Sequence, residues 1–563
     1  MKHCLLFSFN ARATQRNLAI YCLEAVGKNT LPDWQFDTLE LSSNSVFEES
    51  LYRVHQKVQK ILAISCYIWN IEITRSLIKA IKKIHPDLIV LLGGHEVSHD
   101  PQSYLKEGIA DYVISGEGEL SFAQWLLVMD SGADPSQLLK VPGLSFKHPE
   151  RGIVRNPAGK DIEPLDQLPS PYHTNSGALA GNFTYYESSR GCVYKCHFCL
   201  SALDRGSRFF SMPRVFEDLQ KILDQPGIKQ IKFVDRTFNL NYKRTNLIWE
   251  WLIKNGTGRN FHFEIAAELF HESSLELLKK VPEGMFQFEV GVQSIHKEVL
   301  DTNGRRCRLD RLEESLDFLL KNTRVHVHLD LIVGLGGESP SMFQESFDWV
   351  FKKLPHHLQI ETLKLLKGSI SRQKTEEHGY VFLDEPPYSL LHSKLFTYEE
   401  VRRIDEVSAL LELYFNREAL RPVVIEAIHL CNSPWQFFLK FRDFFVEKHP
   451  TFSGLHLRRA YTILAEFLQT ELSEHASDLL GRLTLDCLSS LKCGQGLPFH
   501  KPSRTLSRHE TKNLGLNSLS GFVEEFPSET EFRGIKSRYW IVNRHGEEIT
   551  PFDPGSGVAY ANI

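Results

Sequence analysis

Three cysteines stand within eight residues of one another in the segment SSRGCVYKCHFCLSA, at Cys192, Cys196 and Cys199. Thiolates are soft ligands, and three of them so close together can surround one metal centre. In a four-iron cluster, three cysteines leave one iron without a protein ligand. An open coordination position distinguishes a catalytic metal site from a closed structural one. The spacing therefore predicts a [4Fe-4S] cluster with one reactive iron.

Structural zinc is the main alternative, because cysteine and histidine both bind it. Zinc needs a fourth ligand, but His197 stands between two of the cysteines and the chain has no second C-x-x-C pair. In a reducing compartment, clustered thiols favour metal ligation over disulfides. The other cysteines are scattered, mostly in apolar segments, as small buried hydrophobic residues are: Cys4, Cys22, Cys66, Cys307, Cys431, Cys487 and Cys493.

The first 130 residues alternate between short apolar segments and amphipathic ones. We expect strands at His3–Phe9, Gln35–Leu41, Ile61–Tyr67, Leu88–Leu92 and Tyr112–Ser115, and helices at Asn17–Val26 and Ile71–Ile84. Continuous apolar strands that alternate with helices form parallel sheets covered on both faces. Residues 1–140 are therefore predicted to form a doubly wound parallel sheet of the flavodoxin or Rossmann type.

Glycines follow two of these strands, in Gly93-Gly94-His95 and in Gly116-Glu117-Gly118-Glu119. Ligands of such sheets bind beyond the carboxyl ends of the strands, where bare backbone can approach them closely. Tight strand-to-helix turns would explain the same glycines. No G-x-G-x-x-G follows the first strand, which removes the main support for a dinucleotide site.

Residues 141–180 are rich in Pro, Gly and Asp, and we expect an extended connector there. Strands and helices alternate again over residues 181–390. Strands are expected at Phe183–Ser188, Ile228–Val234, Asn260–Ile265, Met285–Gly291 and Val325–Gly334, with helices such as Arg214–Leu223, Leu247–Lys254 and Leu309–Lys321. This pattern predicts a full or partial (β/α) barrel of the TIM type. The cysteine triplet follows its first strand, so it faces the end of the barrel that carries active sites.

The pattern changes again over residues 391–563, which we expect to form a mainly α-helical domain. Apolar residues recur at three- and four-residue spacing in Tyr398–Glu418, Pro434–Glu447 and Leu455–Leu472. A late strand is expected at Arg538–Asn543. The nearby run RGIKSRYW is basic and aromatic, but a solvated surface explains it better than a nucleic-acid contact, because the net charge is -5.

Composition bounds the class of protein. The 65 Lys and Arg against 70 Asp and Glu argue against a protein that coats nucleic acid or an anionic membrane. No apolar run approaches the roughly 18 to 20 residues of a membrane span. The first residues lack the features of a secretory signal. We therefore expect a cytoplasmic protein.

The C-x-x-x-C-x-x-C motif, with Phe198 before its third cysteine, resembles that of radical S-adenosylmethionine (SAM) enzymes. Other segments are similar to the subgroup of that superfamily with a cobalamin (B12)-binding domain. They are SFNARATQRNLAIYCLEA, ISCYIWN, GGHEVSHDP and DYVISGEGE in the first domain, and FVDRTFNLN, FEVGVQS and HLDLIVGLGGES in the second. The resemblance covers residues 1–390. The helical remainder resembles the C-terminal extension of an incompletely characterised branch, which implies no chemistry.

The resemblance implies that the three cysteines ligate the cluster and that its fourth iron binds the amino and carboxylate groups of SAM. Phe198 would lie near the adenine, with Gly334 as a close backbone neighbour, whereas Glu338 departs by one residue from the commoner spacing. Polar residues at strand ends would contact SAM: Asp235, Glu264, Glu289, Gln293 and Ser294. Carboxylates and amides suit the ammonium and hydroxyl groups of SAM. Each acid could instead belong to the surface or to a salt bridge in the barrel.

For cobalamin, the resemblance implies contacts at the strand ends of the first domain: Asn10, Ser65, Tyr67, Gly93, Gly94, His95, Glu96, Gly116, Glu117, Gly118 and Glu119. The domain lacks the D-x-H-x-x-G motif, whose histidine binds the lower face of cobalt in cobalamin mutases. His95 lacks that context and could cap a helix or touch a corrin amide. Tyr67, Ile68 and Trp69 are candidates for packing against the lower face. The alternative is a domain that kept the fold and lost the corrinoid.

The leading hypothesis is a cobalamin-dependent radical SAM enzyme, a probable methyltransferase. Reductive cleavage of SAM would give a radical that abstracts hydrogen from an unactivated carbon, or a phosphinate-type centre, of an unknown small-molecule or peptide substrate, which then collects a methyl group carried by cobalamin. A reducing partner such as flavodoxin or ferredoxin is expected. One alternative is a radical SAM enzyme that catalyses a rearrangement, cyclisation or oxidation without methyl transfer. Another is a non-catalytic cofactor-binding sensor.

Overall fold

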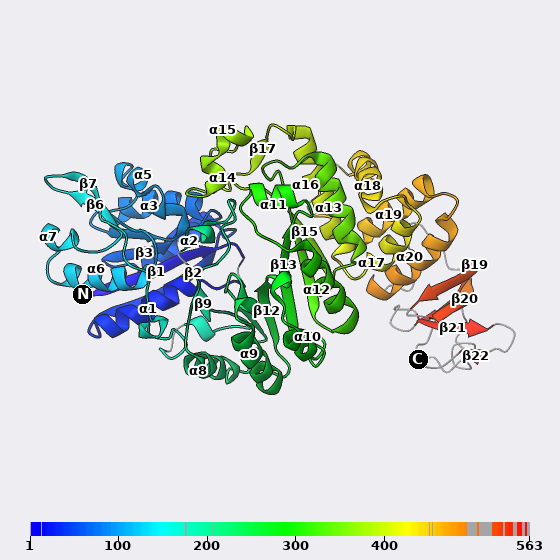
Figure 1. Cartoon of the computed structure of the whole chain (residues 1–563), viewed down its shortest axis with the longest axis horizontal. Helices are drawn as coiled ribbons and strands as arrows, with labels where there is room; N and C mark the ends of the chain where they lie inside the picture. The colour runs from blue at the N-terminus through cyan, green and yellow to red at the C-terminus, as the bar shows by residue number, and fades with distance from the viewer. Residues whose placement is uncertain are drawn as a thin grey trace. The chain divides into compact units, whose positions relative to one another are not determined.

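The computed structural model describes residues 2–491 apart from 13, 175, 176, 205, 450 and 453, and then 504–505, 521–532, 535–543, 549–553 and 558–559. Its contacts divide the chain into two compact units (Figure 1). The first unit comprises residues 1–339 and 362–398, and the second comprises 340–361 and 399–563. The two predicted cofactor domains therefore share the first unit, apart from residues 340–361.

The first unit begins with a sheet whose strand order is β2-β1-β3-β4-β5-β6-β7. Its first five strands pair in parallel, and they are β1 (His3–Asn10), β2 (Gln35–Ser42), β3 (Ile61–Ser65), β4 (Ile89–Gly93) and β5 (Tyr112–Ile114). The order 2-1-3-4-5 is that of flavodoxin-like sheets, so the predicted fold class is confirmed.

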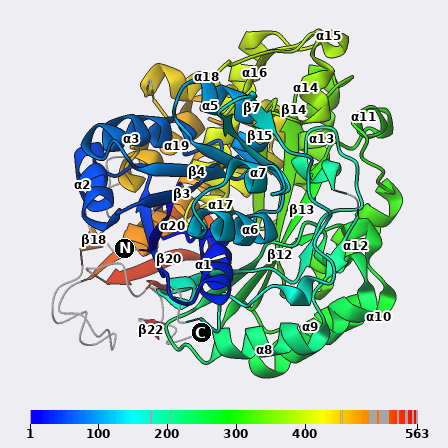
Figure 2. The ribbon, with the colours of Figure 1, turned by 90° about the vertical axis from the view of Figure 1, so that its left-hand side faces the viewer.

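Helices cover both faces of this sheet. They are α1 (Leu18–Thr30), α2 (Phe47–Lys57), α3 (Ile71–Ile84), α4 (His95–Ser98), α5 (Pro101–Lys106), α6 (Glu119–Asp130) and α7 (Pro135–Leu138). Helix α1 packs beside α6, and α2 packs beside α3 across the sheet from them (Figure 2). Every residue of β1 is buried, because both faces of the strand are covered.

Two further strands, β6 (Leu144–His148) and β7 (Gly152–Arg155), extend the sheet in antiparallel orientation. The prediction of an extended connector is therefore wrong for residues 144–155. Leu144 and Phe146 are buried, and the ring centroid of Phe146 lies 6.3 Å from that of Tyr112 on β5. Alternating apolar residues of β6 cover the sheet edge, whereas Pro and Gly nearby obscure this pattern in the sequence.

The predicted barrel strands follow in the same unit, in the order β14-β13-β12-β11-β8. They are β8 (Phe183–Tyr186), β11 (Gln230–Phe233), β12 (Asn260–Ile265), β13 (Phe286–Gln293) and β14 (His326–Val333), all paired in parallel. The helices between them include α8 (Met212–Leu223), α9 (Tyr242–Asn255), α10 (Glu272–Leu278), α11 (Lys297–Thr302) and α12 (Leu309–Asn322). This arrangement confirms the predicted partial barrel.

Side chains alternate between the two faces of these strands. Phe263 and Phe288 pack against Trp249 of α9, at ring distances of 6.0 and 5.3 Å. Their sequence neighbours Glu264 and Glu289 point to the opposite face. The aromatic residues fix the strands to the helices, and the charged residues are left for the interior of the barrel.

The first unit ends with α14 (Ile370–Gln373), α15 (Thr375–His378), β16 (Val381–Phe382) and β17 (Leu390–His392). The second unit holds α13 (Pro340–Lys352), β15 (His357–Thr362), α16 (Tyr398–Leu410), a π-helical turn (Leu411–Phe415), α17 (Arg421–His429), α18 (Pro434–Lys448), α19 (Leu457–Glu471) and α20 (Ala476–Leu491). Phenylalanines form part of its core, for example Phe441 against Phe467 at 4.6 Å. The predicted helical region is confirmed.

The end of the chain adds a small antiparallel sheet in the order β18-β19-β20-β21-β22. Its strands are β18 (Arg504–Thr505), β19 (Gly521–Phe532), β20 (Ile535–Asn543), β21 (Ile549–Asp553) and β22 (Val558–Ala559). The sequence predicted only the strand that corresponds to β20, because Pro527 and several glutamates interrupt the apolar pattern of β19. Part of the RGIKSRYW run, Arg533 and Gly534, lies outside the described residues. Within the part of the chain that is described, no helix is long and apolar enough to cross a membrane.

Candidate functional site

The three clustered cysteines lie in one loop whose two ends pair with each other. Strand β9 (Ser189–Arg190) runs antiparallel to β10 (Arg208–Phe209), and residues 191–207 between them form what we call the cysteine loop. The neck of this loop is tight, because a Cβ atom on Gly191 would lie 2.0 Å from the carbonyl oxygen of Gly206. Gly191 also has a φ of 87°, so only glycine fits there.

The environment of the thiols suits metal binding. Cys192 and Cys196 are buried and Cys199 is half-buried. Burial raises the pKa of the Cys196 thiol, and the guanidinium of Arg305 beside it opposes that shift. A neighbouring cation stabilises the thiolate, which is the form that binds metals. Arg305 was missed in the sequence, because it follows β13 in a segment with no recognisable motif.

Neighbouring segments hold the backbone of the cysteine loop. The His197 amide donates to the Asn303 carbonyl at 2.8 Å, and the Ser371 amide donates to the His197 carbonyl at 3.0 Å. The Cys192 sulfur lies 3.5 Å from the Thr237 hydroxyl. The loop is thus positioned by three separate segments of the first unit.

The donor set fits an iron–sulfur cluster better than one zinc ion. The three thiols come from one loop, a ligand set that a cluster with one open iron takes and that leaves a structural zinc ion one ligand short. A cluster distributes its cysteines over different irons, so its ligands stand farther apart than those around zinc. Outside the loop, Cys4, Cys66 and Cys487 are buried as predicted, Cys22, Cys307 and Cys431 are half-buried, and Cys493 lies outside the described residues.

Two carboxylates line the interior face of the barrel, as their predicted role requires. The Glu289 carboxylate lies 3.0 Å from His262 Nε2 and 3.4 Å from Lys232 Nζ. Burial would raise the pKa of Glu289, but the hydrogen bond with His262 and the charge of Lys232 hold it below its usual range. Burial raises the pKa of Glu264 to about 7, although Arg236 Nη1 lies 3.7 Å away. Both acids remain partly exposed, so a ligand can reach them.

Asp235 has a different environment. It is buried, and its carboxylate accepts hydrogen bonds from the Ser188 amide at 3.0 Å and from the hydroxyls of Ser188 and Ser189 at 2.6 and 2.5 Å. Arg244 in turn donates to the Ser188 carbonyl at 2.8 Å. These groups hold the end of β8 and the start of β9. Asp235 therefore helps to position the cysteine loop, and its direct contact with SAM stays a prediction.

The remaining residues of the SAM prediction lie around the ends of β13 and β14. Gln293 ends β13 with a φ of 68°, Ser294 is buried, and Phe198 is half-buried. A Cβ atom on Gly334 would lie 2.2 Å from Leu390, so a packing constraint already accounts for this glycine. Burial raises the pKa of Glu338 to about 8, and the Ser294 side chain and the backbone of Gly334 and Leu335 offset part of that shift.

At the edge of the first sheet, Tyr67 and Trp69 form a flat aromatic surface. Their rings stack at 4.4 Å with an interplanar angle of 7°, and Trp69 is 50% exposed. Such a surface fits the face of a planar macrocycle. His95 begins α4 nearby. Burial, together with the charge of Arg236, lowers the pKa of His95 to about 4, so its imidazole is uncharged near neutral pH.

Other residues of the cobalamin prediction meet protein groups. The Asn10 amide donates to the Gln15 carbonyl at 2.8 Å and to Glu40 at 2.9 Å. A Cβ atom on Gly94 would lie 2.4 Å from the Cys66 carbonyl oxygen, so this glycine allows the ends of β3 and β4 to approach. Ser65 is buried and Gly93 is half-buried. A Cβ atom on Gly116 or Gly118 would have no neighbour closer than 3.9 Å, so a close approach to protein explains neither glycine.

The three acids at this edge contact cations of the same unit. Glu96 is buried and meets Lys367 Nζ at 2.9 Å and the Tyr388 hydroxyl at 2.5 Å. Glu117 and Glu119 meet Arg208 and Arg190 at the neck of the cysteine loop. These contacts join parts of the first unit, and the direct contacts of the three acids with cobalamin stay predictions. None of their cationic partners was identified from the sequence.

Comparison with known proteins identifies the two parts of the first unit. Residues 14–126 match the B12 binding domain family, and residues 186–350 match the radical SAM superfamily. These two segments are thus similar to a B12-binding domain and to a radical SAM domain. Residues 376–526 match a family described as protein of unknown function (DUF4080), in agreement with the resemblance to an incompletely characterised branch.

Curated relatives match only part of the chain. It is 33% identical over 352 residues to the cobalamin-dependent radical SAM methyltransferase TokK of Streptomyces tokunonensis. This match covers 57% of this chain and 49% of the relative. It is 31% identical over 236 residues to the uncharacterized methyltransferase PH0819 of Pyrococcus horikoshii, which covers 40% and 50%. The chain thus spans about half the length of these relatives.

Solved structures show the same fold at low identity. The cobalamin-dependent SAM radical enzyme OxsB with aqua-cobalamin bound has a TM-score of 0.62 at 14% identity, over 87% of this chain and 79% of that one. The radical SAM methyltransferase TsrM from Kitasatospora setae, with cobalamin and a [4Fe-4S] cluster bound, has a TM-score of 0.56 at 16% identity, over 68% and 76%.

Proposed function

We propose that this protein is a cobalamin-dependent radical SAM enzyme that methylates an unactivated carbon of its substrate. One observation carries the proposal: a single compact unit joins the cysteine loop of a radical SAM domain to a B12-binding domain whose edge presents the Tyr67–Trp69 surface. When bound, the cluster would supply the electron for SAM cleavage and the corrinoid would carry the methyl group.

The residues of the chain divide this work. Cys192, Cys196 and Cys199 would hold the cluster, and Arg305 favours the thiolate form of Cys196. Glu264 and Glu289 supply negative charge for the ammonium group of SAM. The flat Tyr67–Trp69 surface supports the corrin ring. The neutral imidazole of His95 lies beside Tyr67 at the same edge of the first sheet.

The partners and the compartment belong to the same proposal. The acceptor is a small molecule or a peptide, and a flavodoxin or a ferredoxin supplies electrons to the cluster. The protein works in the cytoplasm, because free thiols and a cluster with an open iron require a reducing compartment. The net charge of -5 favours neither nucleic acid nor a membrane surface as partner.

The test is metal content after anaerobic reconstitution with iron, sulfide and hydroxocobalamin. We expect about four irons and one cobalt per chain. Cys196→Ala should abolish iron loading and SAM cleavage and retain cobalt. The half-buried Cys431, outside the loop, provides the matched control, and Cys431→Ala should load both metals. Parental iron content and SAM cleavage in Cys196→Ala would refute the cluster assignment.

Products distinguish methyl transfer from other radical chemistry even without the acceptor. With reductant, cobalamin and SAM, a methyltransferase of this type should form both S-adenosylhomocysteine and 5′-deoxyadenosine. A radical enzyme that only rearranges, cyclises or oxidises should form 5′-deoxyadenosine alone. Iron loading without cobalt, or absence of S-adenosylhomocysteine, would remove the methyl carrier from the proposal. Absence of both products would favour a sensor.

A further inference from the structure

The neck of the cysteine loop carries two arginines that face each other. Arg190 on β9 and Arg208 on β10 are direct partners in the antiparallel register. Their side chains are only 12% and 14% exposed. Like charges directly opposite each other in a β-ribbon are destabilising, and burial increases that cost. The neck can close only if carboxylates from elsewhere balance the two guanidinium groups.

One of the balancing carboxylates belongs to the radical SAM domain. Arg190 donates to the Glu187 carboxylate through Nε at 3.0 Å, and its Nη2 lies 2.9 Å from the same oxygen. Burial raises the pKa of Glu187 to about 7, although Arg190 opposes the shift. Glu187 is the foremost counter-charge of Arg190, but with a pKa of about 7 it is only partly ionised near neutral pH, so the two arginines need other acids as well.

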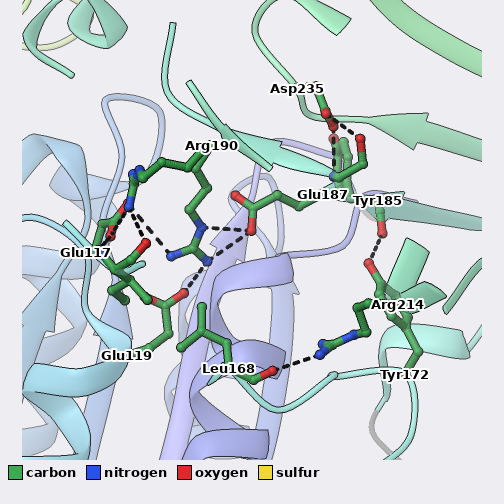
Figure 3. A network of polar contacts seen from close by, with 12 residues as sticks. Glu117, Glu119, Leu168, Tyr172, Tyr185, Glu187, Arg190, Arg214 and Asp235 are labelled. Atoms are coloured by element: carbon green, nitrogen blue, oxygen red, sulfur yellow. Dashed lines mark hydrogen bonds and ion pairs between the residues drawn. The ribbon is translucent and has the colours of Figure 1, made fainter. Parts of the chain in front are cut away.

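The other two carboxylates belong to the B12-binding domain. Arg190 Nη2 contacts the Glu119 carboxylate, and Arg190 Nη1 lies 4.0 Å from Glu117. Arg208 Nη1 donates to Glu117 at 3.1 Å and to the Ile162 carbonyl at 2.8 Å. Figure 3 shows Arg190 between Glu187 on one side and Glu117 and Glu119 on the other. Both arginines therefore bind carboxylates of the turn that follows β5 and leads into α6.

These contacts join the turn before α6 to the narrow neck of the cysteine loop. Glu117 and Glu119 stand between β5 and the start of α6, at the sheet edge where a B12-binding domain holds its ligand. Arg190 is joined directly to Gly191, whose backbone has no room for another side chain. A displacement of the β5–α6 turn would thus be transmitted to the cysteine loop within two residues of Cys192.

We propose that Arg190 is a positioning residue that fastens the cysteine loop to the β5–α6 turn and so sets the separation of the cluster from the corrinoid. The clasp, defined as Arg190 and Arg208 with Glu117, Glu119 and Glu187, rests on contacts within the chain. Its effect on cofactor separation rests on the proposed function. The clasp assigns to Glu117 and Glu119 a role in joining the two domains.

Hydrogen–deuterium exchange of the full-length chain tests the clasp without any cofactor. In Arg190→Gln, amides of residues 191–207 should exchange roughly tenfold faster, because the Glu119 and Glu187 carboxylates lose the guanidinium group that they share. Arg190→Lys should be intermediate, since lysine keeps the charge and loses the planar fork. Glu119→Gln, which keeps side-chain volume, should accelerate the same amides and serves if Arg190→Gln does not fold.

Arg214 offers a matched control in the same junction. It is 16% exposed, pairs with Asp218 at 2.8 Å and donates to the Leu168 carbonyl at 3.0 Å, so it contacts the connector and not the β5–α6 turn (Figure 3). Arg214→Gln should leave exchange of residues 191–207 unchanged. Unchanged exchange of this segment in both Arg190→Gln and Glu119→Gln, or equal acceleration in Arg214→Gln, would overturn the proposal.

Pulsed EPR on the reconstituted protein tests the consequence for the cofactors. The distance distribution between cob(II)alamin and the reduced cluster should broaden in Arg190→Gln at parental iron and cobalt content, and stay narrow in Arg214→Gln. A parental distribution in Arg190→Gln would refute the positioning role. If the parental chain took up no cobalt, the proposed function would fail, and the exchange experiment would still decide whether the clasp exists.

Discussion

Acidic side chains stand at two strand edges of the first unit, and the two edges use them differently. At the first sheet, the Glu96 and Glu119 side chains are only 1% and 9% exposed, and each contacts a cation from a distant segment. Inside the barrel, the side chains of Glu264 and Glu289 keep 27% and 29% exposure. The first pair joins parts of the protein, and the second pair remains accessible to a ligand.

This difference shows that a carboxylate at the carboxyl end of a strand does not identify a ligand contact by itself. Glu96 and Glu264 occupy comparable places in the chain, one just after β4 and the other near the end of β12. What separates them is the cation that each one meets. Lys367 lies 2.9 Å from Glu96, whereas Arg236 lies 3.7 Å from Glu264 and is itself 48% exposed.

The largest expected effect is on folding, and it comes from Glu96→Ala. The change leaves the ammonium group of Lys367, which is 19% exposed, without its carboxylate. Loss of one partner of a buried ion pair costs about 3–5 kcal/mol, so the urea midpoint should fall markedly. Glu264→Ala is the matched variant and should cost less than about 1 kcal/mol. Equal losses in the two variants would abolish the distinction between the edges.

Glu338 extends the comparison of acids to one that is fully buried. Burial raises the pKa of Glu338 from 4.5 to about 8. A raised carboxyl pKa means that the folded state binds the proton more tightly than the unfolded state does. The stabilising contribution is complete below about pH 4.5 and is lost as the pH rises through 8.

The free energy of unfolding should therefore fall between pH 5 and pH 8, by roughly 3 kcal/mol from this group. Glu338→Gln, which stays neutral, should flatten that slope and be more stable than the parent at pH 8. Ser294→Ala serves as a comparison, since it removes a side chain that lowers the pKa of Glu338, and the fall in stability should then extend to higher pH. A parental slope in Glu338→Gln would show that another group titrates.

Local signals were enough to predict much of the architecture. The strands of both parallel sheets and the cysteine loop follow from apolar runs and from the C-x-x-x-C-x-x-C spacing, which are short-range features. The antiparallel hairpin β6–β7 was missed, because Pro and Gly around it suggested a connector. Helices α2, α17 and α20 and most of the final sheet were also missed.

The roles of individual site residues depended on partners far away in the chain. Glu96 meets Tyr388, which is 292 positions later, and Glu119 meets Arg190, 71 positions later. Gly334 has a φ of 86° and lies against Leu390, and Asp235 binds Ser188 and Ser189, which follow β8. A single sequence shows that an acid or a glycine follows a strand. It does not show which cation or side chain the fold brings there.

The glycines of the first sheet edge give a smaller effect of the same kind. Gly94 has a φ of 104°, and a methyl group on it would lie 2.4 Å from a backbone oxygen. Gly116 has a φ of 86° with nothing within 4 Å of such a methyl. Gly94→Ala should therefore lower stability by about 2–3 kcal/mol, and Gly116→Ala by about 1 kcal/mol. Thermal unfolding of the two variants measures the difference, and equal melting temperatures would contradict it.

The smallest expected effect on folding, and the clearest effect on a ligand, belongs to Glu264→Gln. Its ion-pair partner Arg236 lies 3.7 Å away and is 48% exposed, so at pH 4, where Glu264 is protonated in the folded chain, the free energy of unfolding should change by less than about 0.5 kcal/mol. Because the pKa of Glu264 is about 7, the carboxylate gains its charge as the pH rises from 6 to 8.

The ammonium group of SAM should then bind more tightly to the reconstituted parent at pH 8 than at pH 6, by roughly tenfold if Glu264 contacts it. In Glu264→Gln the affinity should be weak and independent of pH, as measured by equilibrium dialysis of labelled SAM. Glu276→Gln is the matched control, because that exposed acid pairs with Lys279 on the same helical segment and should leave both affinity and pH dependence unchanged. If Glu264→Gln retained the parental pH dependence, this barrel acid would not bind SAM. The two edges would then differ in the exposure of their acids and not in ligand binding.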